Sequence, residues 1–264
     1  MNPFFYDKDK EILFIDSWIK EEEIIAGFTT KYGGYSKGAY ASNNQGLHVG
    51  DSKNDVVRNR ELLAKNCGTS LQQWIFAEQI HDSNIHIVTE QDGGRDAKSL
   101  HDVIADIDGL ITMKNNKIAA LMFADCVPIF MYSKIDKVAA ILHAGWKGSV
   151  KEIAKQAIKQ LDELGVSLKN LEIVIGPAIC KTCYEVSEEV INQIPKKHME
   201  CYEIIDNAYH LDLKQLNYLQ LKDSGIDSSQ IVVSNYCTVE SDLFFSHRRD
   251  NGKTGRMLGF IGFK

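Results

Sequence analysis

Three segments of the sequence each carry a side chain that could bind a metal ion. His81 follows Gln-Ile, Cys126 lies in the run Ala-Asp-Cys-Val-Pro, and His143 begins the run His-Ala-Gly-Trp-Lys-Gly. Two imidazoles and one thiolate suit Zn²⁺ and leave a fourth coordination position open for water. An open zinc site lowers the pKa of a bound water toward ~7 and so produces a nucleophile at neutral pH. The same three ligands can also bind a single copper ion.

A thiol nucleophile is a second interpretation of the same residues. Cys126 could attack a substrate carbon with His81 or His143 as its general base. Asp125 is adjacent in sequence, but the alternation of side chains along a strand predicts that it points to the opposite face. The spacings of 45 residues from His81 to Cys126 and 17 from Cys126 to His143 are not diagnostic. A single buried cysteine is more often a small hydrophobic residue, so the residues alone do not decide between ligand and nucleophile.

The segment 244–256 is rich in arginine and glycine. Arg248 and Arg249 could hold a phosphate group through paired N–H donors. The alternative is a solvated surface turn with an internal Arg–Asp pair, and both interpretations stay open. The sequence contains neither G-x-x-x-x-G-K-[ST] nor G-x-G-x-x-G, so a P-loop or a Rossmann cofactor site is not supported.

The other cysteines and the histidine count limit the remaining metal chemistry. Cys180-Lys-Thr-Cys183 is a single C-x-x-C with no second ligand pair nearby in the sequence, so we expect a turn with two ordinary thiols. The chain has 8 histidines and no His-x-His. A four-copper oxidase needs many paired histidines, so this sequence argues against one.

Composition excludes several classes of protein. The 264 residues are 44% hydrophobic and 25% charged, which is typical of a globular chain, and the net charge of −6 argues against nucleic-acid binding. The longest apolar run is too short to span a membrane, and the first ten residues do not have the pattern of a secretory signal. We therefore expect a cytoplasmic protein whose six cysteines are mostly reduced. The sequence does not predict the oligomeric state.

The elements that must position these residues alternate between strands and helices. Strands are expected at Ile12–Ile15, Ile24–Thr29, 171–175 and Ile231–Val233. Four more, at 109–113, 119–123, 128–132 and 138–142, are so closely spaced that they predict an antiparallel meander. Helices are expected at 55–65, 147–164 and Leu213–Asp223, with another that opens at Ser187 and ends near Pro195. These elements predict an α+β protein or an α/β/β/α sandwich with mixed, largely antiparallel sheets, in one domain over 1–264.

Seven short motifs follow one another along the sequence. They are Asn44-Gln-Gly-Leu-His48-Val-Gly-Asp51, Gln79-Ile-His81, Asp108-Gly-Leu-Ile-Thr112, Ala124-Asp-Cys126-Val-Pro128, His143-Ala-Gly-Trp-Lys-Gly148, Gly176-Pro-Ala-Ile with Cys183-Tyr-Glu-Val186, and Phe244-Phe-Ser-His-Arg-Arg-Asp250. In this order they resemble the YfiH/YlmD family of laccase-domain, or polyphenol-oxidase-like, proteins. The resemblance covers roughly residues 27–262. Five positions depart from the usual pattern without removing a proposed ligand: Asn43, Gln45, Asp82, Lys147 and His247.

The resemblance implies a single α/β sandwich with a catalytic zinc held by His81, Cys126 and His143. It implies the phosphorolysis of adenosine, inosine and S-methyl-5′-thioadenosine, and the deamination of adenosine. Purine nucleosides and phosphate would be its partners. The motif matches imply substrate-binding positions for four further residues: Asn44, His48, Arg248 and Arg249.

A mechanism and its rivals follow as hypotheses. In deamination, His48 or a carboxylate could shuttle the proton; in phosphorolysis, Arg248 or Arg249 could hold the phosphate that attacks C1′. The alternatives are a Cys-His hydrolase, a peptidoglycan-precursor editing factor, or a mononuclear copper polyphenol oxidase. A binding partner of cell-division or envelope proteins with vestigial activity is another alternative.

Overall fold

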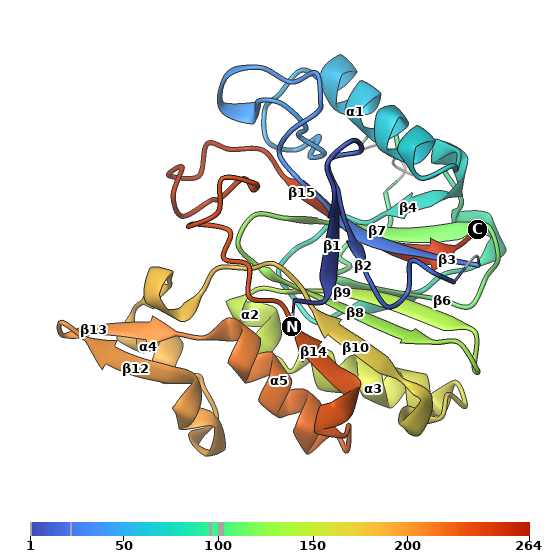
Figure 1. Cartoon of the computed structure of the whole chain (residues 1–264). Coiled ribbons are helices and arrows are strands. Elements are labelled where there is room, and N and C mark those ends of the chain that lie inside the picture. The colour runs from blue at the N-terminus through green and yellow to red at the C-terminus, as the bar shows by residue number, and fades with distance from the viewer. Residues whose placement is uncertain (1, 22, 95–96, 100–102) are drawn as a thin grey trace.

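Two six-stranded β-sheets pack face to face at the centre of the protein (Figure 1). The computed structural model describes residues 2–21, 23–94, 97–99 and 103–264. Across the first sheet the strands are β1 (Phe4–Asp7), β2 (Ile12–Ile15), β3 (Ile24–Thr29), β15 (Met257–Phe263), β7 (Lys117–Phe123) and β4 (Trp74–Phe76). Across the second they are β14 (Ile231–Val233), β10 (Glu172–Ile175), β8 (Val127–Ser133), β9 (Val138–Ala144), β6 (Gly109–Thr112) and β5 (Ile85–Ile87). The pairs β4–β7, β5–β6 and β10–β14 are parallel, and the other neighbours in these two sheets are antiparallel.

Helices cover the outer faces of both sheets. Helix α1 (Lys53–Asn66) packs on the first sheet, and α3 (Ile153–Glu163) and α5 (Leu213–Asp223) pack on the second (Figure 1). The layers run helix, sheet, sheet, helix, which confirms the predicted α+β class with largely antiparallel sheets. The described part of the chain has no helix long and apolar enough to cross a membrane.

Shorter elements complete the described chain. A small sheet of β11 (Glu185–Val186), β13 (Ala208–Leu211) and β12 (Tyr202–Ile205) projects beside α4 (Glu188–Ile191) at one side of the sandwich (Figure 1). Helix α2 (Trp146–Val150) directly follows β9. Short 3₁₀ helices occupy Gly38–Tyr40, Leu71–Gln73, Glu90–Asp92, Leu168–Asn170, Lys181–Cys183, Lys196–Cys201 and Ser228–Gln230.

The alternation of side chains along each strand divides the interior into layers. In β8, Ile129 and Met131 face the helices α3 and α5, while Phe130 and Tyr132 face the other sheet. Successive strand residues point to opposite faces, so a strand buried on both sides must be apolar throughout. Each such large side chain contributes roughly 1.5–3 kcal/mol on burial. The stacked sheets therefore form a rigid platform whose edges can hold a site.

The structure corrects three details of the sequence prediction. The helix expected at 147–164 is broken into α2 and α3 because Glu152 adopts a left-handed conformation, with φ of 59°. The expected meander is also wrong, since β7 pairs with β15 and β4 in the first sheet while β6, β8 and β9 lie in the second. Strand β15 was not predicted because its two glycines are typical of turns. A Cβ at Gly262 would lie 2.1 Å from the Lys117 carbonyl oxygen, so the close strand contact requires glycine.

Candidate metal centre

His81, Cys126 and His143 converge at one edge of the sandwich. Cys126 directly precedes β8, and His143 lies next to the end of β9; the two strands pair with His143 opposite Pro128. His81 lies in the loop between β4 and β5. The three ligand atoms lie within 4.8 Å of one another. A tetrahedral zinc ion with bonds of about 2.0–2.3 Å places such atoms roughly 3.3–3.8 Å apart. The three residues therefore fit a metal ion after a small inward movement.

Asp108 holds two of these three residues in place. Its Oδ1 accepts a hydrogen bond from His143 Nδ1 at 2.7 Å, and its carboxylate also accepts the backbone N–H groups of Ile80, His81 and Asp82 at 2.8 to 3.1 Å. The bond to Nδ1 leaves Nε2 of His143 for Cys126 or a metal. A carboxylate behind a histidine in this way fixes its tautomer and strengthens it as a ligand.

The tight backbone around the centre depends on local conformation and on glycine. His81 has φ of 61°, in the left-handed region that L-residues seldom adopt, and the Asp108 bonds stabilise the loop that carries it. A Cβ at Gly145 would lie 3.1 Å from Cys126 Sγ and 3.2 Å from His81 Cδ2. A side chain at this position would therefore press against two of the three ligands.

The charges of Cys126 and His143 depend on each other. Burial would raise the pKa of the Cys126 thiol, but the imidazoles of His143 and His81 outweigh burial and lower the pKa to about 6. Burial would lower the pKa of His143, but Cys126 and Asp108 raise it to about 9. Both shifts favour a thiolate and an imidazolium in the metal-free protein. A thiolate is the form of cysteine that binds metals and attacks carbon.

A cavity of about 590 Å³ opens beside the three residues. Pockets for small molecules commonly measure about 300–1,000 Å³, so a molecule the size of a nucleoside fits. Apolar and aromatic side chains are mixed with polar and charged ones. The lining consists of His48, Ala77, Glu78, Gln79, His81, Val103, Met122, Ala124, Asp125, Cys126, His143, Trp146, Ile179, Tyr184, His247, Arg248 and Arg256.

The four residues expected to bind substrate divide into two groups. His48 and Arg248 line the cavity. The side chain of Asn44 is bonded instead to Gly46 and Asp51 and accepts the backbone N–H of Arg256. The guanidinium of Arg249 is bonded to Asp250 and to three backbone carbonyls. Direct contact of Asn44 and Arg249 with a substrate stays a prediction, and their observed contacts position the neighbouring loops.

Asp125 does not act on Cys126 directly. Its carboxylate accepts hydrogen bonds from Thr238 Oγ1 at 2.6 Å, Ser246 Oγ at 3.0 Å and the Arg248 backbone N–H at 2.7 Å. This carboxylate therefore joins the loop that carries Cys126 to the C-terminal loop and sets the position of Arg248.

Reasoning from the sequence assigns no role to three residues that shape the site. Asp108 was recognised only as part of a motif, although an acidic residue immediately before a buried strand is a usable signal. Arg256 and Tyr184 line the cavity, but they lie in loops whose course depends on distant pairing. Burial, Arg256 and other cationic neighbours lower the pKa of His48 to about 4, so His48 is neutral at pH 7.

The chain is similar to known proteins over nearly its whole length. Residues 25–264 match the family model described as multi-copper polyphenol oxidoreductase laccase. The chain is 44% identical to the purine nucleoside phosphorylase YlmD of Bacillus subtilis over 262 residues, covering 96% of this chain and 94% of that protein. It is 42% identical to the protein of the same name from Geobacillus stearothermophilus, covering 90% and 89%.

Solved structures show the same fold over the whole chain. The crystal structure of the hypothetical protein YfiH from Bacillus licheniformis has a TM-score of 0.96 at 40% identity, with 100% of both chains covered. The crystal structure of YlmD from Geobacillus stearothermophilus has a TM-score of 0.95 at 38% identity, again with 100% of both chains covered.

Proposed function

Because this chain belongs to the YfiH/YlmD family, whose model is described as multi-copper polyphenol oxidoreductase laccase, we propose that it is a zinc-dependent purine nucleoside phosphorylase with adenosine deaminase activity. Its substrates would be adenosine, inosine and S-methyl-5′-thioadenosine, together with phosphate. The observation that carries the proposal is the convergence of His81, Cys126 and His143 on a cavity of nucleoside size. The names of the relatives support the phosphorylase activity.

The metal would be held by His81, Cys126 and His143. A zinc ion bound there supplies Lewis acidity and lowers the pKa of water. Two imidazoles and one thiolate form a donor set for zinc that leaves one position open, and copper accepts the same set. Asp108 keeps His143 oriented with Nδ1 protonated and Nε2 toward the centre.

In phosphorolysis, a phosphate oxygen bonds to C1′ of the ribose while the bond from C1′ to the purine N9 breaks. Arg248 and Arg256, which both line the cavity, provide positive charge for the phosphate. Arg248 is already oriented, because its guanidinium donates to the carbonyls of Cys183 and Glu185 and its Cζ lies 5.1 Å from the centre of the Tyr184 ring. The phosphate enters as a protonated anion and loses its proton as the sugar phosphate forms, and the departing purine takes up that proton.

In deamination, water adds at C6 of adenosine and ammonia leaves, so protons must move from the water to the leaving amine. Glu78 and Asp125 are carboxylates in the cavity lining, and His48 is a neutral imidazole there. Because Asp125 is already saturated by three donors, Glu78 and His48 are the better proton carriers.

Product analysis tests the proposal. Purified protein is incubated with adenosine in the presence and absence of inorganic phosphate, and the purines and sugars are separated and quantified. Phosphorolysis gives adenine and ribose 1-phosphate only with phosphate, while deamination gives inosine without it. Failure to form any of these products with zinc-loaded protein would overturn the proposal.

A Cys-His hydrolase is the second candidate function. The observation that favours it is the contact of the Cys126 thiol with the His143 imidazole, which lowers the pKa of the thiol as in an activated nucleophile. A covalent intermediate trapped on Cys126 during turnover by metal-free protein would support this candidate. Loss of all turnover on metal removal would argue against it.

A further inference from the structure

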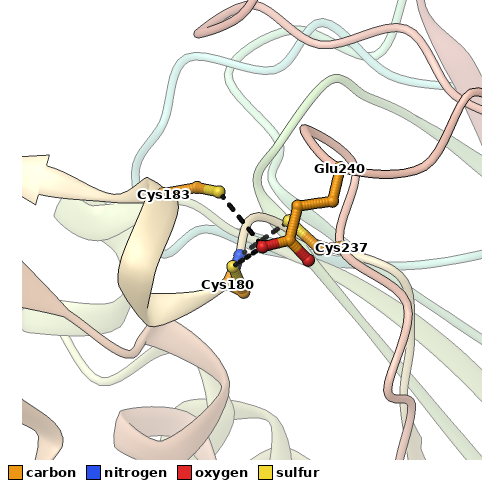
Figure 2. Close-up of side chains that lie close together, drawn as sticks. All are labelled: Cys180, Cys183, Cys237 and Glu240. Atoms are coloured by element: carbon orange, nitrogen blue, oxygen red, sulfur yellow. Dashed lines mark hydrogen bonds between the residues drawn. The ribbon is translucent and has the colours of Figure 1, made fainter.

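A second group of potential metal ligands lies outside the site described above. The side chains of Cys180, Cys183, Cys237 and Glu240 point toward one another, and their ligand atoms lie within 4.8 Å of one another (Figure 2). We name these four residues the cysteine cluster. Glu240 Oε1 lies 3.5 Å from Cys180 Sγ and 3.6 Å from Cys183 Sγ. The sequence predicted only two ordinary thiols here, because Cys237 follows Cys183 by 54 residues.

Long-range backbone pairing assembles the cysteine cluster. Ala178 and Cys237 form an isolated parallel β-bridge, and the Thr238 N–H donates to the Ala178 carbonyl. The pairing places the turn Lys181–Cys183 against the residues that follow Cys237. The backbone N–H of Cys180 donates to Cys237 Sγ at 3.4 Å. The four side chains therefore meet because of the fold and not because of a local sequence motif.

The two halves of the cysteine cluster are built alike. Each half has a cysteine followed three residues later by a second ligand, as Cys180-x-x-Cys183 and Cys237-x-x-Glu240. The backbone of Cys183 lies near the sulfur of Cys180 and the backbone of Glu240 lies near the sulfur of Cys237, and each favours the thiolate form of its neighbour. Paired turns with N–H groups directed at sulfur are the means by which proteins stabilise thiolate ligands on a metal.

We infer that the cysteine cluster is a second metal site, which takes a thiolate-preferring divalent cation of the zinc class. Three sulfurs and one carboxylate oxygen make a closed tetrahedral donor set, which is typical of a structural site. Bound zinc would place its sulfur ligands roughly 3.8 Å apart, so the separations within 4.8 Å need only a small contraction. Cys237 is 5% exposed, while the Glu240 side faces solvent and gives the ion a route in.

Neighbouring charges suit this donor set. Three thiolates and one carboxylate around a divalent cation leave a net charge of −2, which nearby cations must offset. Lys214 interacts electrostatically with Cys180, Cys237 and Glu240, and its Nζ donates to the carbonyls of Ser234 and Tyr236. The guanidinium of Arg248 donates to the carbonyl of Cys183. A disulfide would use only two of the sulfurs and would leave Glu240 beside the third thiol without a role.

The ion would fasten the turn that carries Cys180 and Cys183, which borders the cavity, to the segment that carries Cys237 and Glu240. Ile179 and Tyr184 flank the turn that carries Cys180 and Cys183, and both line the cavity. Arg248 rests on the same turn. Binding of the ion therefore positions cavity residues without touching the substrate. If the proposed function holds, loss of the ion raises KM for the nucleoside more than it lowers kcat, whereas metal binding itself does not depend on that function.

Counting metal ions tests the second site. The full chain is produced with added zinc under reducing conditions, dialysed, and analysed for metal and protein. We expect two zinc ions per chain in the wild type, one in Cys237→Ala and one in Cys126→Ala, which removes a ligand from the other centre. Cys201→Ala is the matched control, since Cys201 is a buried cysteine in neither cluster, and it should keep two. Glu240→Gln should keep the three sulfurs but release the ion to a chelator at roughly tenfold lower chelator concentration.

Alkylation of the wild-type protein provides a second test. It needs no variant, so its result does not depend on whether a variant folds. With zinc bound, Cys180, Cys183 and Cys237 should be protected from iodoacetamide, and removal of the ion with a chelator should expose them together, as followed by peptide mass spectrometry. A wild-type chain whose bound zinc is kept undiminished in Cys237→Ala, or unchanged alkylation after chelation, would each overturn the inference; a single ion that is lost in Cys237→Ala but kept in Cys126→Ala would instead contradict the first centre. A disulfide among the three cysteines under the same reducing conditions would also overturn it.

Discussion

Asp108 Oδ1 lies 2.7 Å from His143 Nδ1 at the centre of the candidate active site. The same carboxylate also binds the backbone N–H of His81 at 3.1 Å, so one buried side chain orients two of the three expected metal ligands. The third ligand, Cys126, is placed by the hairpin of β8 and β9. Removal of Asp108 should therefore damage the metal centre without removing a ligand.

Asp108→Asn should weaken zinc binding by about 10–100-fold and lower activity, because a neutral amide is a poorer acceptor for the Nδ1–H group of His143 and no longer strengthens that imidazole as a ligand. Competition with a fluorescent chelator measures the affinity. Asp106→Asn is the matched control, since Asp106 is exposed and only two residues away. Equal zinc affinity in Asp108→Asn and the wild type would show that the carboxylate does not support the ligands.

Metal-free protein should show a Cys126 thiol that is alkylated rapidly near neutral pH. The pKa of Cys126 is lowered to about 6, so the thiolate dominates above that pH, and the alkylation rate should level off near pH 7. The alkylation rate of an ordinary cysteine, with a pKa of ~8.5, would keep rising up to about pH 9. His143→Ala should move the midpoint upward. A midpoint at the ordinary value in the wild type would contradict the ion pair. Zinc should protect Cys126 from the reagent.

The two neighbouring arginines should behave differently when replaced. Arg248→Ala should raise KM for phosphate by at least tenfold and leave the melting temperature nearly unchanged, because Arg248 is exposed and lines the cavity. Arg249→Ala should instead lower the stability by about 1–3 kcal/mol, because it removes donors to the carbonyls of Thr238, Val239 and Phe244.

Steady-state kinetics and thermal unfolding of the two variants measure these effects. Lys159→Ala, on the exposed face of α3, is the control and should change neither property. The assignment of Arg248 as the phosphate contact would be contradicted if KM for phosphate were unchanged in Arg248→Ala. It would also be contradicted if KM for phosphate rose only in Arg249→Ala.

Much of the fold follows from local patterns in the sequence. Strands such as Ile12–Ile15 and Ile231–Val233 and the helix Leu213–Asp223 lie where apolar periodicity places them. The path of β7 into the other sheet could not be predicted, because hydrophobic runs show that a strand is buried but not which partner it takes. Strand β15 was missed since its glycines are required by contacts with distant residues.

Only part of the candidate site could be predicted, again because contacts between residues far apart in the sequence position the rest. The ligand types of His81, Cys126 and His143 are visible in the sequence, and the order of the motifs suggested that they belong together. Asp108 and Arg256 are positioned by tertiary contacts with residues that lie far from them in the sequence. The cysteine cluster depends on the pairing of Ala178 with Cys237, which no sequence motif indicates.

The most direct test of the metal-dependent reaction compares zinc-loaded, metal-stripped and reloaded protein on adenosine with phosphate, with Cys126→Ala alongside. Release of adenine is followed by chromatography, and bound zinc is measured in the same samples. We predict that release stops when zinc is removed, returns when zinc is restored, and is absent in Cys126→Ala. Undiminished release of adenine by metal-stripped protein would contradict the assignment of His81, Cys126 and His143 as the metal centre of the reaction.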